Sequence, residues 1–204
     1  MPKSGERPKE GRDMTAMAHE PITQDLLLEW FLALDTPEGF RAELIEGEIV
    51  VTPPPDGDHE DYMGLIVSQV HRRSVTEMQF SGNKGLKMKN ADGLLADHVI
   101  PDGTFTPAVS RLYRGAEPWM PCDGVSLVLE VTSSKPKADR ETKRHACARG
   151  DIPFYLLVDR QESSITLFSD PGRDDYRQHC TVAFGKPLTL PAPFSFDLDT
   201  TDFL

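Results

Sequence analysis

Two acidic residues stand beside strand-like segments, where a carboxylate is suited to bind a hard cation. Asp102 follows Pro101 and precedes GTFTP, while Glu130 lies inside the largely apolar run VSLVLEVT. A carboxylate buried in a strand is costly unless it binds a metal or a partner. Two plainer interpretations stay open, because Pro-Asp is a common turn pair and a glutamate near a strand end often reaches solvent.

A lysine further along the chain is the third candidate. Asp139 and Lys143 are four residues apart, so they share one face of a helix. Either they form a surface ion pair worth about a few tenths of a kcal/mol, or Lys143 points back over the sheet towards Glu130. The two alternatives place the amine in opposite environments.

The elements around these residues predict a strand, a helix and a second strand. Residues 125–132 form a nearly continuous apolar run with several β-branched residues, typical of a strand buried on both faces. A helix over 137–149 follows and ends at Gly150, and PFYLLVD at 153–159 is a second buried strand. This order implies a right-handed crossover and a parallel strand pair, and ligand sites form at the carboxyl ends of such strands.

The N-terminal half predicts a helix, a hairpin and a longer helix. Thr23 is a plausible N-cap for the helix QDLLLEWFLAL. Two apolar runs flank Glu46-Gly47, which predicts a β-hairpin with Gly47 at positive φ. Apolar residues at helical spacing predict the longest helix over 58–78. The expected fold class is α/β, with a mixed central β-sheet flanked by helices and an N-terminal helix and β-hairpin.

Taken in order, these pieces resemble the putative restriction endonuclease family of the PD-(D/E)XK nuclease superfamily, over roughly residues 24–185. The matching pieces are ELIEGE at 43–48, His59, Pro101-Asp102, LEV at 129–131, Asp139 with Lys143, and IPFYLLVD at 152–159. No single motif is decisive, but their order and spacing are specific. The resemblance implies a restriction-endonuclease-like sheet.

The resemblance also implies a catalytic site. Asp102 and Glu130 would bind Mg²⁺, with Mn²⁺ as a substitute, and the backbone carbonyl of Val131 would be a further ligand. Lys143 would orient the attacking water or stabilise the developing charge, and Glu43 would contribute directly or through water. His59, Asp139, Thr132 and Lys135 would support the site or contact the substrate.

Two residues depart from the family pattern. The superfamily signature has a lysine two residues after the glutamate, where this chain has Thr132, so the lysine role maps onto Lys143 of the following helix. Cys147 stands where family members usually carry a tyrosine.

Composition limits the classes of protein that fit. The net charge of −11 opposes tight binding of nucleic acids. One dense basic stretch contains Lys135, Lys137, Arg140, Lys143, Arg144 and Arg149. Residues 1–20 carry no apolar signal segment and predict a disordered leader, with one domain over 21–204. We expect a cytoplasmic protein without a membrane segment, whose three widely spaced cysteines are reduced.

Three functions are consistent with these observations. The leading hypothesis is a metal-dependent endodeoxyribonuclease that acts on DNA as a homodimer, because double-strand cleavage needs two sites. The alternative is a catalytically inactive nuclease-fold protein that serves as a binding or assembly module, which the acidic charge, the displaced lysine and Cys147 favour. A third is a metal-assisted phosphoesterase for nucleotides or RNA.

Overall fold

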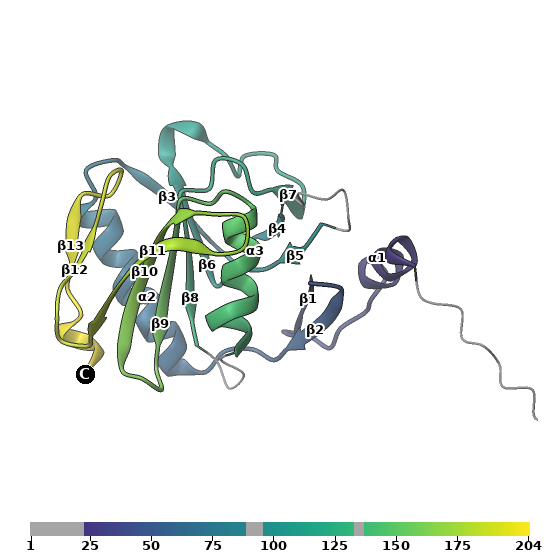
Figure 1. Ribbon diagram of the computed structural model, residues 1–204, viewed down its shortest axis with the longest axis horizontal. Coiled ribbons are helices and arrows are strands. Elements are labelled where there is room, and N and C mark those ends of the chain that lie inside the picture. Colours follow the sequence, from purple (N-terminus) through teal and green to yellow (C-terminus); the bar gives the residue numbers. More distant parts are fainter. Residues whose placement is uncertain (1–22, 89–95, 133–136) are drawn as a thin grey trace, which may run out of the picture.

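A computed structural model of the protein describes residues 23–88, 96–132 and 137–204 (Figure 1). The six-stranded sheet contains, in spatial order, β11 (Tyr176–Ala183), β10 (Ser164–Pro171), β9 (Phe154–Asp159), β8 (Leu127–Val131), β6 (Gly103–Pro107) and β3 (Met78–Gly82). The five-stranded sheet contains β2 (Glu48–Thr52), β1 (Arg41–Ile45), β5 (His98–Val99), β4 (Gly85–Lys87) and β7 (Trp119–Pro121). A separate pair is formed by β12 (Leu188–Leu190) and β13 (Phe196–Leu198). The expected α/β class is confirmed, with the strands divided between two mixed sheets and this pair.

The predicted strand–helix–strand unit lies at the centre of the six-stranded sheet. β8 and β9 are parallel, with Val131 beside Val158, and every residue of β8 is buried. A π-helical turn at Ala138–Thr142 leads into α3 (Lys143–Arg149), and the helix ends at Gly150 as its sequence predicts. This unit brings the end of β8 and the start of α3 together.

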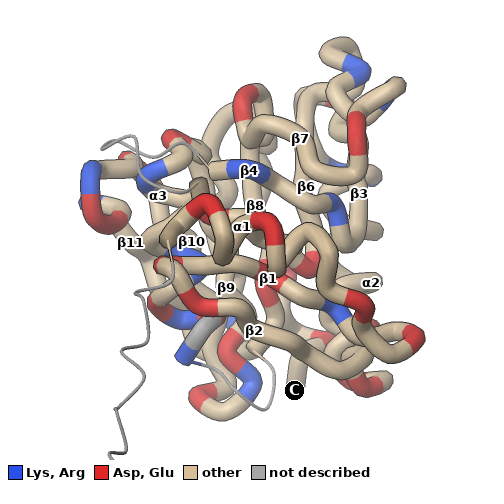
Figure 2. Tube along the Cα trace, turned by 90° about the vertical axis from the view of Figure 1, so that its right-hand side faces the viewer, with Lys and Arg blue, Asp and Glu red and all other residues tan. Residues whose placement is uncertain are grey.

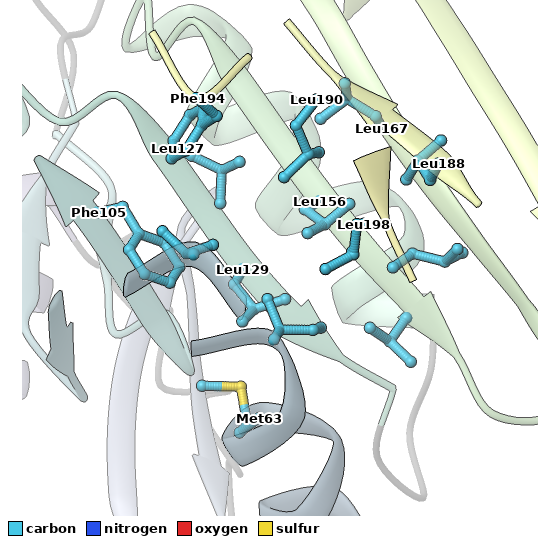
Figure 3. Close-up of a cluster of buried hydrophobic side chains, with 14 of the residues drawn as sticks. Met63, Phe105, Leu127, Leu129, Leu156, Leu167, Leu188, Leu190, Phe194 and Leu198 are labelled. Carbon is cyan, nitrogen blue, oxygen red and sulfur yellow. The ribbon is translucent and has the colours of Figure 1, made fainter. Parts of the chain in front are cut away.

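A large apolar core fills the other face of this sheet (Figure 3). Met63 projects from α2 (Gly57–Arg73) onto Phe105, Leu129 and neighbouring side chains. Full burial of one such side chain stabilises the fold by about 1.5–3 kcal/mol. The core fixes where α2 lies on the sheet, and with it the residues of its first turn.

The N-terminal elements match their predictions closely. The hydroxyl of Thr23 accepts a hydrogen bond from the Leu26 amide at 3.3 Å at the start of α1 (Gln24–Leu32). β1 and β2 pair antiparallel, and the turn between them has positive φ at Glu46 (52°) and Gly47 (80°), as a two-residue hairpin requires.

Two features differ from the sequence-based expectation. α2 ends at Arg73 rather than near residue 78, because the chain turns extended at Ser74 (ψ 133°) to enter β3. Residues 107–124, which their Pro and Gly content predicts as a loop, contain β7. Trp119 of β7 lies within 5.5 Å, centroid to centroid, of both Phe31 and His98, and this aromatic contact joins α1 to the five-stranded sheet.

The proposed leader over residues 1–20 lies outside the described part of the chain. Among the residues that are described, no helix combines the length and the apolar character needed to cross a membrane. The cysteines at 122, 147 and 180 are all free thiols.

Candidate metal and catalytic site

The two acidic residues predicted to bind metal lie on neighbouring strands of the six-stranded sheet. Asp102 immediately precedes β6, and Gly103 of β6 pairs with Leu129 of β8, so the antiparallel register sets Asp102 beside Glu130. Both are buried, with 7% of Asp102 and 0% of Glu130 exposed. A Cβ at Gly103 would lie 2.6 Å from a ring carbon of Phe80, so only glycine allows β6 to start here without displacing that ring.

Asp102 receives hydrogen bonds from three directions. Its Oδ2 accepts from Nε2 of His59 at 2.9 Å and from the backbone amide of Val131 at 3.0 Å. Its Oδ1 lies 3.3 Å from the guanidinium of Arg41. Burial alone would raise the pKa of Asp102, but the hydrogen bond from His59 and the positive charge of Lys143 outweigh burial and hold that pKa well below its usual range.

Lys143 lies inside a group of three carboxylates. Its Nζ is 3.3 Å from Oε2 of Glu43, 3.3 Å from each carboxyl oxygen of Glu130, and 3.6 Å from Oδ1 of Asp139. Only 6% of Lys143 is exposed. Of the two arrangements that the sequence allows, the structure therefore has the one in which the amine points back towards Glu130.

Glu43 reaches this group from the other sheet. It belongs to β1, and only 2% of it is exposed. Its Oε1 accepts a hydrogen bond from the amide of Ile100 at 2.7 Å, while its Oε2 contacts Lys143. The cluster thus joins the five-stranded sheet, the six-stranded sheet and α3.

The π-helical turn holds Asp139 and Lys143 on the side that faces the sheet. A π-turn has hydrogen bonds over five residues rather than four, and such turns are frequent at functional sites. Here the carbonyl of Asp139 accepts a hydrogen bond from the fully buried hydroxyl of Tyr155 at 2.5 Å. This bond fixes the start of α3 against β9.

The cluster contains more buried negative charge than Lys143 can balance. Burial raises the pKa of Glu130 well above its ordinary value; Lys143 lowers it, while the neighbouring carboxylates raise it further. Burial likewise raises the pKa of Glu43, against the opposing charge of Lys143. For Lys143 itself, burial favours the neutral amine, but the surrounding carboxylates dominate and raise its pKa well above the ordinary value.

The residues present fit a hard divalent cation by their chemistry. Carboxylate and carbonyl oxygens are the ligands that Mg²⁺ prefers. Oε1 of Glu130 is fully buried and accepts no hydrogen bond, although it pairs with Lys143 by charge. Within the described ranges, no three His, Cys, Asp or Glu side chains are already arranged around a common point as metal ligands. The oxygen atoms of this cluster are thus of the kind that Mg²⁺ prefers as ligands, and the ammonium group of Lys143 lies between the carboxylates.

The remaining residues singled out in the sequence occupy varied positions. His59 is buried in the first turn of α2, where its side chain contacts Asp102. Thr132 is buried and its hydroxyl accepts a hydrogen bond from the amide of Arg160 at 3.0 Å. Val131 lines the cleft described below. Lys135 lies outside the described residues.

A cleft of about 170 Å³ opens above the cluster. Asp102, Val131, Asp139 and Lys143 line one part of it. The cleft is also lined by consecutive residues that begin at the end of β2, namely Val51, Thr52, Pro53, Pro54, Pro55 and Asp56. The cleft therefore gives solvent access to the side of the cluster that carries Asp102 and Lys143.

Two arginines that the sequence reasoning did not select also line this cleft. Arg41 contacts Asp102 and donates a short hydrogen bond to Oδ1 of Asn83. Arg160 follows β9 directly and contacts Asp56. Arg41 stands two residues before Glu43 in the same strand, and this spacing is the one local signal that could have pointed to it.

Comparisons with known proteins place this arrangement among nuclease-like folds. Residues 28–201 match the protein family described as "Putative restriction endonuclease" (Uma2). A crystal structure from Anabaena variabilis, described as a putative nuclease belonging to DUF820, aligns with a TM-score of 0.59 at 22% sequence identity, covering 89% of this chain and 97% of that chain. At this identity the likeness shows a shared fold. A search of curated proteins gave no match.

Proposed function

Because the chain belongs to the putative restriction endonuclease family, as its motif order predicts, we propose that it is a Mg²⁺-dependent endodeoxyribonuclease that hydrolyses phosphodiester bonds. The observation that carries this proposal is the burial of Lys143 among Glu43, Glu130 and Asp139, beside Asp102. Asp102 and Asp139 of this group line the cleft, and such a concentration of buried carboxylates favours the binding of an additional cation.

Asp102, Glu130 and the backbone carbonyl of Val131 would hold the metal ion, with Mn²⁺ able to replace Mg²⁺. When bound, the ion would lower the pKa of a water molecule and polarise the phosphodiester. The unsatisfied Oε1 of Glu130 supports its role as a ligand, because a buried carboxylate oxygen gains most from a nearby positive charge. Glu43 supports the site from the opposite sheet.

Lys143 supplies the second positive charge. Its ammonium is held by carboxylates from three elements, so its position is fixed before any substrate binds. There it orients the attacking water or stabilises the negative charge that develops on the phosphate oxygens. Its long side chain, projecting from α3, serves in place of the lysine that the superfamily signature puts at Thr132.

His59 and Arg41 act through Asp102. The hydrogen bond from His59 at 2.9 Å and the guanidinium of Arg41 at 3.3 Å fix the orientation of the carboxylate, and the bond from His59 helps to hold its pKa low. Partners of this kind typically change metal affinity or activity by about 10–100-fold when removed.

The test uses purified protein, supercoiled plasmid and Mg²⁺ or Mn²⁺. We expect metal-dependent nicking that is lost in Asp102→Ala, Glu130→Ala and Lys143→Ala. Nicking that persists unchanged in the Asp102 and Glu130 variants would come from a contaminating enzyme and would refute the proposal. Single-stranded DNA, RNA and nucleotide substrates tested in parallel separate a deoxyribonuclease from a phosphoesterase of other specificity.

A second candidate function is a non-catalytic binding or assembly module. Two observations favour it: Thr132 stands at the signature lysine position, and the described side chains form no ready-made group of three metal ligands. Calorimetry distinguishes the two functions, because a module of this kind binds neither Mg²⁺ nor Mn²⁺ at millimolar concentration.

We also propose that two copies of the chain associate. Of the nine large apolar side chains that are exposed in the described part of the chain, six lie between residues 26 and 51, in α1, the β1–β2 hairpin and the segment that joins them. Acidic positions also lie along these elements (Figure 2). Light scattering tests the proposal, since a mass of 22.7 kDa, that of one chain, would contradict it.

A further inference from the structure

Arg160 is anchored at the rim of the cleft. It follows β9, and its backbone amide donates to the hydroxyl of Thr132 at 3.0 Å. Its guanidinium lines the cleft together with Arg41 and Lys143. The end of the parallel strand pair therefore carries a positive charge beside the position where the superfamily signature has its lysine.

The partner of Arg160 is an exposed carboxylate that also lines the cleft. Arg160 donates three hydrogen bonds to Asp56, at 3.0, 3.1 and 3.1 Å, through both terminal nitrogens. Asp58 lies 3.8 Å away. The side chain of Asp56 is 61% exposed, and that of Arg160 is 24% exposed. A guanidinium binds phosphate through the same two-nitrogen geometry that it uses here for a carboxylate.

Among the described residues, the other lysine and arginine that line the cleft are committed to buried partners. Arg41 contacts Asp102, and Lys143 contacts Glu43 and Glu130. Displacing either from its carboxylate would leave a buried charge without its partner, which is strongly unfavourable. The Arg160–Asp56 pair is exposed to water on the Asp56 side, so exchanging its carboxylate for another anion costs little.

We propose that Arg160 binds a DNA phosphate at the rim of the cleft and that Asp56 occupies it as an internal phosphate mimic in the free protein. The inference rests on the proposed function and adds the contact that positions the substrate backbone. In a chain of net charge −11, local cations of this kind must supply the attraction for phosphate. Asp56 would lower the affinity for DNA until a phosphate replaces it.

The experiment compares Arg160→Gln with Asp56→Asn. Binding of a fluorescein-labelled DNA duplex is measured by anisotropy over a series of salt concentrations, with Ca²⁺ in place of Mg²⁺ and the duplex checked for integrity. For Arg160→Gln we expect about tenfold weaker binding and a salt slope smaller by about 0.9. Asp56 is the N-cap of α2, where its Oδ1 accepts a hydrogen bond from the amide of His59 at 2.9 Å. For Asp56→Asn we expect about threefold tighter binding, because Arg160 is then free for phosphate while asparagine can still cap α2.

The opposite changes in DNA affinity expected for the two variants distinguish phosphate binding by Arg160 from a salt bridge that only stabilises the fold. Both variants break the same ion pair, so any damage to the fold moves DNA affinity in the same direction. Arg177→Gln is the matched control, since Arg177 pairs with Asp170 at 3.0 Å and does not line the cleft. We expect it to bind the duplex like the wild type.

Each remaining outcome has a defined meaning. If the wild type binds and nicks DNA but Arg160→Gln binds equally well, or if both variants weaken binding alike, the inference is wrong while the proposed function stands. If the wild type neither binds the duplex nor nicks plasmid, the proposed function fails and the inference fails with it.

Discussion

Asp102 and Glu130 lie side by side on adjacent strands and are both buried, yet their surroundings differ sharply. Asp102 receives hydrogen bonds from His59 and the Val131 amide, with Arg41 close by, and its pKa is lowered. Glu130 has an oxygen without a hydrogen bond, and burial raises its pKa. Equal burial therefore does not give equal ionisation; the number of donors around each carboxylate decides it.

The largest effect is expected from removing the cation that both carboxylates share. Lys143→Met leaves buried carboxylates without their main positive charge, so the free energy of unfolding should fall by about 3–5 kcal/mol. Urea denaturation at neutral pH measures the loss. Lys186→Met, at an exposed lysine, is the control and should change stability by less than about 0.5 kcal/mol. A Lys143 variant as stable as this control would contradict the charge balance described for the cluster.

Replacing each of the two carboxylates with its neutral amide should change the free energy of unfolding differently at the two positions. Asp102→Asn weakens charged hydrogen bonds and should cost about 1.5–3 kcal/mol of stability. Glu130→Gln removes a buried charge that has too few donors, so stability should stay unchanged or rise by up to about 1 kcal/mol. Thermal or urea unfolding of both variants, without metal, provides the measurement. Equal losses in the two variants would show that the environments do not differ as described.

The pH range over which each group affects stability should differ between the Asp102–His59 pair and Glu130. The pKa of Asp102 is lowered from 3.8 and that of His59 is raised from 6.5, so their pair stabilises the protein most between about pH 4 and 6.5. That contribution is lost as pH falls through the pKa of Asp102 and as it rises through the pKa of His59. The pKa of Glu130 is raised above 4.5, so its contribution falls as pH rises above that value.

Unfolding free energies of wild type, His59→Gln and Glu130→Gln between pH 4 and 8 test these pH ranges. The advantage of wild type over His59→Gln should be about 1–2 kcal/mol near pH 5 and shrink towards pH 8. The free energy of unfolding of Glu130→Gln should exceed that of wild type by an amount that grows as the pH rises towards 8. If the free energy of unfolding had the same pH dependence in all three proteins, the difference described between Asp102 and Glu130 would be wrong.

The smallest effect on stability is expected at Glu60, which lies on the solvent side of His59. Glu60 lies 3.5 Å from Nδ1 of His59, but its side chain is 63% exposed. Glu60→Gln should therefore change the free energy of unfolding by less than about 0.5 kcal/mol. A loss comparable to that of His59→Gln would mean that His59 is held from the solvent side rather than by Asp102.

The central part of the fold was predictable because its signals are local. The apolar run around Glu130, the four-residue spacing of Asp139 and Lys143, and Gly150 after the helix each lie within a few residues of the structure they specify. By contrast, the π-turn before α3 has no distinct local pattern. Its stability depends on the hydroxyl of Tyr155, which belongs to another strand.

The contacts across the cleft were not predictable for the same reason. Arg160 and Asp56 are 104 residues apart, and Arg41 and Asp102 are 61 apart. Which side chains meet depends on how the two sheets and α2 dock, and nothing near these residues encodes it. His59 could be selected as a candidate site residue from its place in the motif order, whereas its bond to Asp102 follows from the packing of α2 on the core.

The meeting of the two sheets at Glu43 and Lys143 has a consequence for biosynthesis. Glu43 is made early in translation, whereas α3 and its lysine leave the ribosome much later. A nascent chain that has formed only its first sheet contains no complete set of reacting groups. Under the proposed function, acquisition of activity is therefore tied to completion of the fold.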